Sequence, residues 1–281
     1  KARKLSQEVA EIAGNYDIVH THDWFGAETG FKAKKYGAAK WVTTFHSLAS
    51  GRNRNPSEEL QKFEEVAVEN SDQLLAVSEK LAGEVENEFG RRPEVIHNGF
   101  SVPESSGKYV KEELGIGNEM VFFVGRHSEQ KGIEHPLYGF KKLLEERDVD
   151  LVIGGKGHMT DALRDFAEML EIGEKVHFAG YIPERELGDY YRAADVFVSS
   201  SINEPFGLTI TEALETGTSV VATRNGVEEI AGDSIISVEP ESDSLKNGIL
   251  EALKIEREID PVSRSWSEMA EETIEVYREI E

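Results

Sequence analysis

Apolar residues in this chain gather in short unbroken runs, and segments with helical spacing separate most of these runs. We expect strands at residues 17–20, 41–45, 73–77 and 94–97, and then at 120–124, 149–153, 176–179, 196–198, 220–222 and 235–238. The helical segments 57–71 and 78–90 each begin with a Ser, a residue type suited to an N-cap. Continuous apolar strands that alternate with helices are typical of parallel sheets covered on both faces. The pattern predicts an α/β fold with two doubly wound, Rossmann-like domains.

A stretch rich in Gly, Ser and Pro, residues 98–119, interrupts this alternation and is the best candidate for a linker. It divides the chain into an N-terminal domain, residues 1–103, and a C-terminal domain, residues 104–264. The N-terminal part supplies fewer strands than the C-terminal part, and it opens on a helical stretch. We therefore expect the N-terminal domain to be incomplete at its start.

The charge balance restricts the possible partners. The 281 residues include 31 basic and 54 acidic side chains, giving a net charge of −23, and no cysteine. Such a surface repels nucleic acids, so we expect no nucleic-acid partner, and an anionic ligand must meet a local basic pocket. No apolar run approaches the roughly 18 residues of a membrane span. These features, with the absence of an apolar leader, favour a cytoplasmic enzyme.

Two carboxylates eight positions apart, Glu204 and Glu212, follow the predicted strand 196–198. Ligands of open α/β sheets bind at the carboxyl ends of the strands. Gly207 delays the next helix until Leu208, which leaves the first amides, including that of Thr209, available to an anion such as a phosphate. A ligand with central phosphates and hydroxyl-bearing rings at both ends, a nucleotide sugar, suits this arrangement. Alternatively, Glu212 balances a helix dipole and Glu204 is a solvated loop residue.

A second strand end supports an anion site. In the segment FFVGRHSEQKG, residues 122–132, Gly125 permits a tight turn and two cations follow, Arg126 and Lys131. Arg can bind phosphate oxygens through two parallel hydrogen bonds, and Lys adds a point charge. The alternative is a pair of solvated surface cations.

These two segments, GRHSEQKG and EPFGLTITEALETGTSVVAT, resemble the retaining GT-B glycosyltransferases of the family that includes glycogen, starch and sucrose-phosphate synthases (glycosyltransferase family 4-like). The spacing Glu-x7-Glu is the signature of that family. The segments HTHDWFG, TTFHS and VIHNGF resemble further family elements in the same order. The segment SWSEMAEETIEVYREI resembles the terminal helix, here 265–281, that crosses back to the N-terminal domain. The resemblance implies two Rossmann-like domains that face a cleft.

The resemblance also implies roles for single residues. Lys131 and Arg126 would hold the donor diphosphate, Glu204 the hydroxyls of the transferred sugar, and Glu212 the ribose. The donor-binding residues would be Gly125, Arg126, Lys131, Tyr181 (against the base), Glu204, Phe206, Gly207, Leu208, Thr209 and Glu212. From the N-terminal domain, His46 would bind the sugar and Asp23 would align sugar or acceptor. The catalytic residues would be Asp23, His46, Arg126, Lys131 and Glu204.

The predicted function is transfer of a hexose, with retention of configuration, from a nucleoside-diphosphate sugar to a hydroxyl acceptor, a saccharide or a small molecule. No metal and no cofactor is expected. Two other classes stay open: a GT-B nucleotide-sugar epimerase, and a donor-binding module with a degenerate acceptor domain. A metal site at His20, His22 and Asp23 is geometrically possible but lacks further ligands in the sequence.

The chain departs from the family pattern at two places. Asn225 stands where many members have the first of two glycines, and because Asn tolerates positive φ we expect the loop conformation to be kept. The Gly-rich acceptor loop expected near the N-terminus is not found in this sequence. The base, the sugar and the acceptor are therefore not specified by the motifs.

Overall fold

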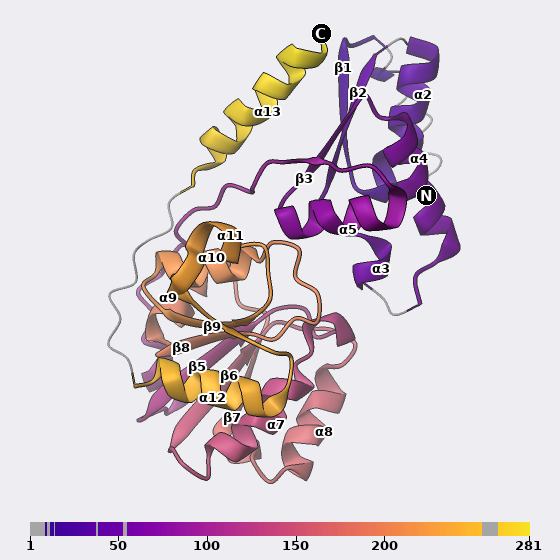
Figure 1. The fold of residues 1–281 in the computed structure, drawn as a ribbon. Coiled ribbons are helices and arrows are strands. Elements are labelled where there is room, and N and C mark those ends of the chain that lie inside the picture. Colours follow the sequence, from indigo (N-terminus) through magenta and orange to yellow (C-terminus); the bar gives the residue numbers. More distant parts are fainter. Residues whose placement is uncertain (1–8, 10–11, 14, 38, 53–54, 255–263) are drawn as a thin grey trace. The chain divides into compact units, whose positions relative to one another are not determined.

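The chain forms two compact units, residues 1–99 with 264–281 and residues 100–263 (Figure 1). This computed structural model describes all residues except 1–8, 10–11, 14, 38, 53–54 and 255–263. The predicted domain boundary was placed after residue 103, and the predicted terminal helix lies in the first unit. The helical stretch predicted at the N-terminus falls largely outside the described residues.

The N-terminal unit is built on a four-stranded parallel sheet in the order β1-β2-β3-β4. Its elements are β1 (Ile18–His22), the 3-10 turn η1 (Trp24–Gly26), α2 (Ala27–Gly37), β2 (Lys40–Phe45), α3 (Ala49–Arg52), α4 (Glu58–Asn70), β3 (Gln73–Ala76), α5 (Glu79–Phe89), β4 (Glu94–Val95) and α13 (Trp266–Ile280). Successive side chains of a strand point to opposite faces of the sheet. Accordingly Trp41 lies against α2, while Val42 shares a buried cluster with Leu75, Ile96 and Val276 of α13.

Helix capping in this unit agrees with the sequence at both predicted positions, which differ in their side-chain hydrogen bonds. The Ser78 hydroxyl accepts a hydrogen bond from the amide of Leu81 at 3.1 Å, as expected of an N-cap. Ser57 is the N-cap residue of α4, as predicted, and its backbone is extended, but its side chain makes no capping hydrogen bond. Two acidic residues in the first turn of α4, Glu58 and Glu59, complement its dipole.

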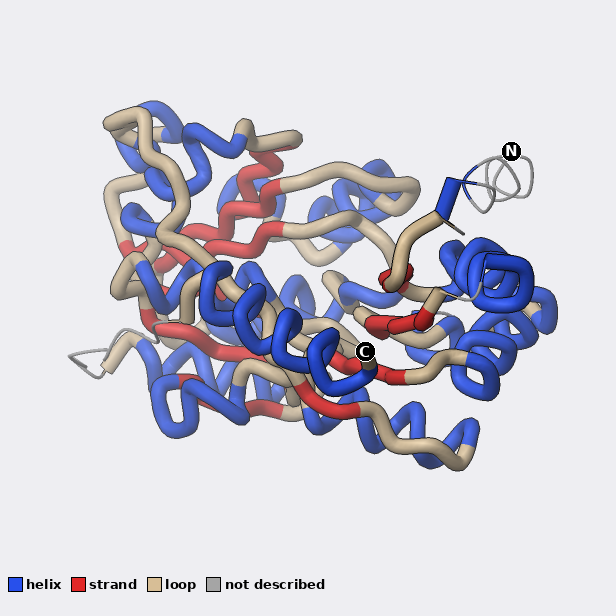
Figure 2. Tube along the Cα trace, turned by 90° about the horizontal axis from the view of Figure 1, so that it is seen from above, coloured by secondary structure: helices blue, strands red, loops and turns tan. Residues whose placement is uncertain are grey.

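The C-terminal unit contains a six-stranded parallel sheet in the order β10-β9-β8-β5-β6-β7. Its elements are α6 (Val110–Leu114), β5 (Glu119–Val124), η2 (Glu129–Lys131), α7 (Glu134–Leu143), β6 (Val149–Gly154), α8 (Thr160–Met169), η3 (Gly173–Lys175), β7 (Val176–Gly180), α9 (Glu184–Ala193), β8 (Val196–Ser199), α10 (Leu208–Glu215), β9 (Ser219–Thr223), α11 (Glu228–Ala231), η4 (Gly232–Ser234), β10 (Ile235–Val238) and α12 (Ser242–Ala252). Each predicted strand of both units is present, within one or two residues at its ends. Figure 2 shows these strands in red among the helices.

The strand order of this sheet reverses between β5 and β8, which are neighbours although two other strands separate them in sequence. This is the Rossmann-type order, in which the connections from the two central strands leave toward opposite faces and open a crevice at their carboxyl ends. The loops that follow β5 and β8 therefore meet at this switch point. They are the two loops in which the sequence predicted the anion site.

Each face of the larger sheet has its own packing. Val121 and Phe123 of β5 lie in a buried hydrophobic cluster with residues of α7, α8 and α12. The intervening Phe122 points to the other face, where its ring lies 5.4 Å from that of Tyr191 and 6.0 Å from that of Phe197, centroid to centroid. This aromatic cluster fixes α9 on the sheet.

Candidate functional site

The loops after β5 and β8 are joined by an ion pair between two predicted site residues. The Lys131 ammonium lies 2.6 Å from Oε2 of Glu204, and the hydroxyl of Ser201 donates to the same oxygen at 2.8 Å. The side chains of Lys131 and Glu204 remain 23% and 13% exposed, so an entering ligand can reach both. The structure thus brings together the cation and the first carboxylate of the predicted site.

Backbone and side-chain hydrogen bonds hold these two loops in register. The Ser200 hydroxyl donates to the carbonyl oxygen of Lys131 at 2.8 Å, and the Ile202 amide donates to the carbonyl of Gln130 at 2.9 Å. The Gln130 side-chain amide in turn donates to the carbonyl oxygen of Asn203 at 3.2 Å. Because the loops are tied together on both sides of the ion pair, the position of Lys131 relative to Glu204 is largely preset.

Helix α10 begins directly beside Glu204. Gly207, its N-cap, has φ +111°, a conformation that L-residues with a side chain rarely adopt, and a Cβ there would lie 2.8 Å from Cδ1 of Ile210 and 3.3 Å from Cγ of Glu204. Phe206 is buried, whereas Leu208 is exposed and Thr209 is half-buried. The first amides of a helix have no intrahelical acceptor and favour an anion. The helix start and Lys131 are thereby neighbours through Glu204.

Glu212 lies one turn further along α10, and its environment was not foreseen from the sequence. Oε2 of Glu212 accepts a hydrogen bond of 2.8 Å from the hydroxyl of Tyr191, a fully buried residue of α9. Burial raises the pKa of Glu212, while the hydrogen bond from Tyr191 acts in the opposite direction and Glu184 raises it further. No sequence signal marked Tyr191, which appears only as an apolar position in a helical run.

The other predicted donor-binding residues lie at the carboxyl ends of β5 and β7. Gly125 follows β5, and a Cβ on Gly155 would lie 1.9 Å from the Gly125 carbonyl oxygen, so the loops after β5 and β6 touch through their backbones. Arg126 is exposed and, among the described residues, forms no hydrogen bond or ion pair with Glu204 or with other side chains. Tyr181 follows β7 and is 71% exposed. Arg126 and Tyr181 thus follow strands of the same sheet as the loops of the Lys131–Glu204 pair, and Tyr181 follows the edge strand β7.

Asn225 does not adopt the positive φ that an Asn would tolerate. Among the described residues other than glycine, only Asp23 and Glu171 have positive φ. The Asn225 side chain instead accepts hydrogen bonds from the amides of Val227 at 2.9 Å and Glu228 at 3.2 Å, and it donates to the carbonyl of Thr223. Asn225 therefore fixes the loop through its side chain and accepts a hydrogen bond from the first amide of the short helix α11.

In the N-terminal unit, Asp23 organises the loop that carries His46. Asp23 is buried and has φ +53°, a sparsely populated conformation for a non-glycine residue. Oδ1 accepts hydrogen bonds from the amides of His46 at 2.7 Å and Ser47 at 3.3 Å, and Oδ2 lies 2.8 Å from the guanidinium of Arg52. The structure thus brings together Asp23 and His46 and adds Arg52, which the sequence did not indicate.

Three histidines at the ends of β1 and β2 form a neutral group. His22 Nδ1 lies 3.0 Å from His46 Nε2, and His20 hydrogen-bonds Tyr277 at 2.6 Å and Thr44 at 2.7 Å. Burial lowers the pKa of all three imidazoles, that of His20 to about 4. His20, His22 and Asp23 do not converge on a common point, and the described residues contain no group of three or more His, Asp or Glu that could hold a metal ion.

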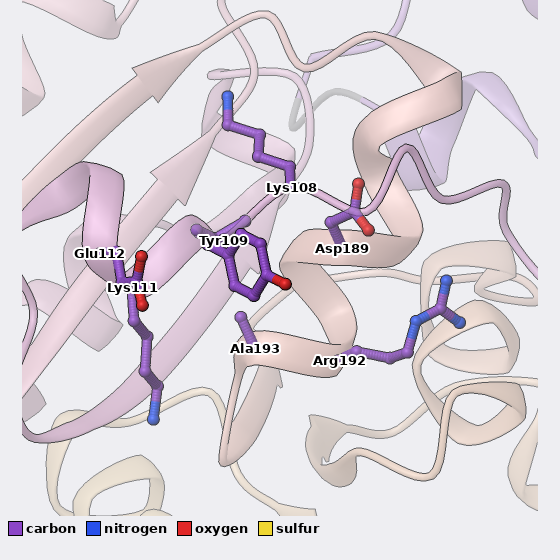
Figure 3. Close-up of a pocket in the computed structure, with 8 residues that line it drawn as sticks. Lys108, Tyr109, Lys111, Glu112, Asp189, Arg192 and Ala193 are labelled. Carbon is purple, nitrogen blue, oxygen red and sulfur yellow. The ribbon is translucent and has the colours of Figure 1, made fainter.

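A separate pocket of about 350 Å³ lies between α6 and α9, away from these site residues. Figure 3 shows that the charged groups of Lys108, Lys111 and Arg192 point in different directions rather than toward one another. Lys111 pairs with Asp195 at 2.7 Å, and Lys108 lies 3.2 Å from Glu186. This pocket is lined by the end of α9, which leads into the start of β8, whereas the predicted site follows the ends of the strands.

Comparison with solved structures identifies the fold. The chain aligns over 99% of its length with 79% of sucrose-phosphate synthase from Thermosynechococcus elongatus, with a TM-score of 0.80 and 21% identity. It aligns over 98% of its length with 82% of the Anabaena protein HepE, solved in complex with UDP and glucose, with a TM-score of 0.84 and 20% identity. The predicted fold class is confirmed: this is the GT-B architecture of glycosyltransferases.

Sequence comparison then gives the family. The model described as Glycosyl transferases group 1 matches residues 109–273, and the model described as Glycosyltransferase Family 4 matches residues 1–102. The chain belongs to the group 1 family of glycosyltransferases, which confirms the resemblance found in its motifs.

Two curated relatives illustrate the extent of the similarity. An uncharacterized glycosyltransferase of Methanocaldococcus jannaschii is 32% identical over 94% of this chain and 75% of its own length. A D-inositol 3-phosphate glycosyltransferase of Thermobifida fusca is 30% identical over 79% of this chain and 57% of its own length. None of the helices in the described part of the chain has the length and hydrophobicity of a membrane span.

Proposed function

We propose that this protein transfers a hexose from a nucleoside-diphosphate sugar to a hydroxyl acceptor with retention of configuration. The observation that carries the proposal is the Lys131–Glu204 ion pair of 2.6 Å beside the start of α10, at the switch point of the sheet. It joins a cation for phosphate, free helix amides and a carboxylate for sugar hydroxyls within one site. The complex of HepE with UDP and glucose lends support, because that protein shares the fold.

The leaving group determines what this site must do. Breaking the bond between the sugar and the diphosphate places negative charge on the departing phosphate. The Lys131 ammonium and the amides at the start of α10 supply positive potential there, and Arg126 extends it at the same edge of the sheet. As proposed, these groups provide the charge stabilisation for which other enzymes use a metal ion. Retention fits a mechanism in which the departing phosphate and the acceptor occupy the same face of the sugar.

The other residues of the predicted site bind the transferred sugar, the ribose and the base. Glu204 accepts hydrogen bonds from hydroxyls of the transferred sugar once the diphosphate engages Lys131. Glu212 binds the ribose, and Tyr181, which is largely exposed, offers its ring to the base. His46 is neutral and donates to or accepts from a sugar hydroxyl, while Asp23 holds the His46 backbone and aligns the reactants through it.

Donor binding is tested by thermal denaturation in the presence of UDP, ADP and GDP and of their glucose and mannose conjugates. A ligand at about 100 times its Kd stabilises the native state by about 2.7 kcal/mol, which is readily measured as a rise in melting temperature. We expect at least one nucleoside diphosphate to raise it, and Lys131→Ala to abolish the rise. Lys142→Ala is the matched control, because Lys142 also forms a 2.6 Å ion pair in the same unit, with Asp243.

Retention is tested separately, by proton NMR of the anomeric centre in the product formed with the active donor. An axial donor linkage should give an axial product linkage. An inverted product would contradict the proposed mechanism, whereas a melting temperature that responds to no nucleotide would contradict the donor site itself.

A further inference from the structure

A buried phenol from a different helix holds the second carboxylate of the donor site. Tyr191 of α9 is fully buried, and its hydroxyl donates to Oε2 of Glu212 at 2.8 Å. A buried hydroxyl requires a hydrogen-bond partner, and Glu212 supplies it. In the described part of the chain, this is the one hydrogen bond made by the Glu212 carboxylate.

The ring of Tyr191 is itself fixed, so its hydroxyl points in one direction. Its centroid lies 5.4 Å from that of Phe122 and 5.3 Å from that of Phe197, both edge-on. The Thr218 hydroxyl donates to the backbone carbonyl of Tyr191 at 2.7 Å. Side chains from β5 and β8 and the residue that precedes β9 thereby fix Tyr191, which in turn binds Glu212.

This contact has two effects on Glu212. It occupies Oε2 and leaves Oε1 as the acceptor for a ligand. It also stabilises the charged form of a carboxyl whose pKa is raised by burial and by Glu184 at the start of α9. A charged acceptor in a fixed orientation forms stronger hydrogen bonds with hydroxyl groups than a neutral or freely rotating one.

We propose that Tyr191 is a positioning residue for donor recognition, which orients Glu212 so that its Oε1 accepts hydrogen bonds from the ribose hydroxyls of a nucleoside diphosphate. The inference rests on the proposed function, in which Glu212 binds the ribose of the donor. It predicts that the effect of Tyr191 is confined to ligands that carry those hydroxyls.

The test compares two ligands and two variants by calorimetric titration. The ligands are whichever of UDP, ADP and GDP binds the wild-type protein, and its 2′,3′-dideoxy form. We expect the wild type to prefer the ribose form by roughly tenfold, because a hydrogen bond to a charged group is lost in the other. Tyr191→Phe should weaken binding of the ribose form by roughly tenfold and change binding of the dideoxy form less than about twofold.

Tyr190→Phe is the matched control. Tyr190 is also buried, lies next to Tyr191 on the same helix, and its ring is 5.6 Å from that of Phe122, but it makes no hydrogen bond with Glu212. We expect it to leave both affinities within about twofold of the wild-type values. In turnover assays, Tyr191→Phe should raise KM for the donor with a smaller change in kcat.

If Tyr191→Phe does not fold, the same change is made in Glu212→Gln, where no buried charge is left without its donor. The double variant should then discriminate between the two ligands as poorly as Glu212→Gln alone, since both changes act through one contact. Equal weakening of both ligands by Tyr191→Phe, or unchanged discrimination, would overturn the inference and leave the proposed function standing. Failure of the wild type to bind any diphosphate would overturn both.

Discussion

Glu64 of α4 shows how a single buried side chain supports the site loop of the N-terminal unit. Glu64 is fully buried, and its Oε1 accepts a hydrogen bond of 2.8 Å from the amide of Ala49 at the start of α3. Oε2 is buried and, in the part of the chain that the structure describes, lacks a hydrogen-bond partner. Arg52, at the end of α3, binds Asp23, so Glu64 supports Asp23 through this helix.

Burial raises the pKa of Glu64 to about 7, from a usual value of 4.5. Between these values the native state binds more protons than the unfolded state, so the free energy of unfolding should fall as pH rises from about 4.5 to about 7. Glu64→Gln keeps the acceptor for Ala49 and removes the charge. We expect it to be more stable than the wild type at pH 8, by about 1–3 kcal/mol, and similar at pH 4.5.

Urea denaturation of both proteins at the two pH values measures this difference. Glu88 lies close enough to raise the pKa of Glu64, and Glu88→Gln is the control, which should produce a smaller change of the same sign. A Glu64→Gln variant that is less stable than the wild type at pH 8 would show that the charged carboxylate is stabilised in the native protein.

For single residues, the sequence could predict site residues that lie within one short segment. It could not predict side-chain contacts between residues of distant segments. Glu204, Gly207 and the helix start beyond them were predictable because Pro and Gly limit the local backbone. The pairs Tyr191–Glu212 and Asp23–Arg52 were not, because each joins two elements whose packing must be known first.

The start of α10 is the element on which the proposed donor site depends most directly. Gly207→Ala places a Cβ at φ +111°, against Ile210 and Glu204. We expect a loss of about 1–3 kcal/mol of stability from backbone strain, together with a loss of diphosphate binding, because the amides at the helix start must move.

Gly217→Ala separates these two effects. Gly217 also has positive φ, +77°, but a Cβ there would meet nothing within 4 Å. This variant should lose a similar amount of stability and retain diphosphate binding. Calorimetric titration and thermal denaturation of both variants check the prediction, and equal loss of binding in the two would indicate a general effect of destabilisation.

The strands were predictable because each is a continuous apolar run, as required of strands buried on both faces. Strand ends differ by a residue or two, since apolar character does not report where the last ladder hydrogen bond falls. Ser57 occupies the predicted N-cap position without a side-chain hydrogen bond for a related reason. Whether a Ser side chain turns back to the first helical turn depends on backbone and rotamer choices that its sequence position does not specify.

For the whole molecule, strand order was the decisive property that composition and spacing could not supply. The neighbouring positions of β5 and β8 bring Lys131 to Glu204, residues that are 73 positions apart. The resemblance of the motifs to GT-B enzymes predicted that Lys131 and Glu204 belong to one site, because it implied the fold of that family. Periodicity alone predicted parallel sheets without their order.

The net charge of −23 makes mutual repulsion a property of the entire chain. Added salt screens interactions between exposed charges over distances beyond about 8 Å at 0.15 M. We expect the melting temperature to rise by several °C, about 2–4 °C for each kcal/mol gained, between 0.05 and 0.5 M NaCl. KCl should give the same rise, and a fall in melting temperature would show that surface ion pairs outweigh the repulsion.

The position of α13 in the N-terminal unit has a consequence for biosynthesis. Val276 completes the buried cluster around Val42, and Tyr277 hydrogen-bonds His20, although more than 200 residues lie between them. On the ribosome, the unit that begins with residues 1–99 must therefore wait for α13, while residues 100–263 form a contiguous unit that can fold earlier. The N-terminal unit thus begins to leave the exit tunnel first, but all of its residues are available for folding only after those of the C-terminal unit.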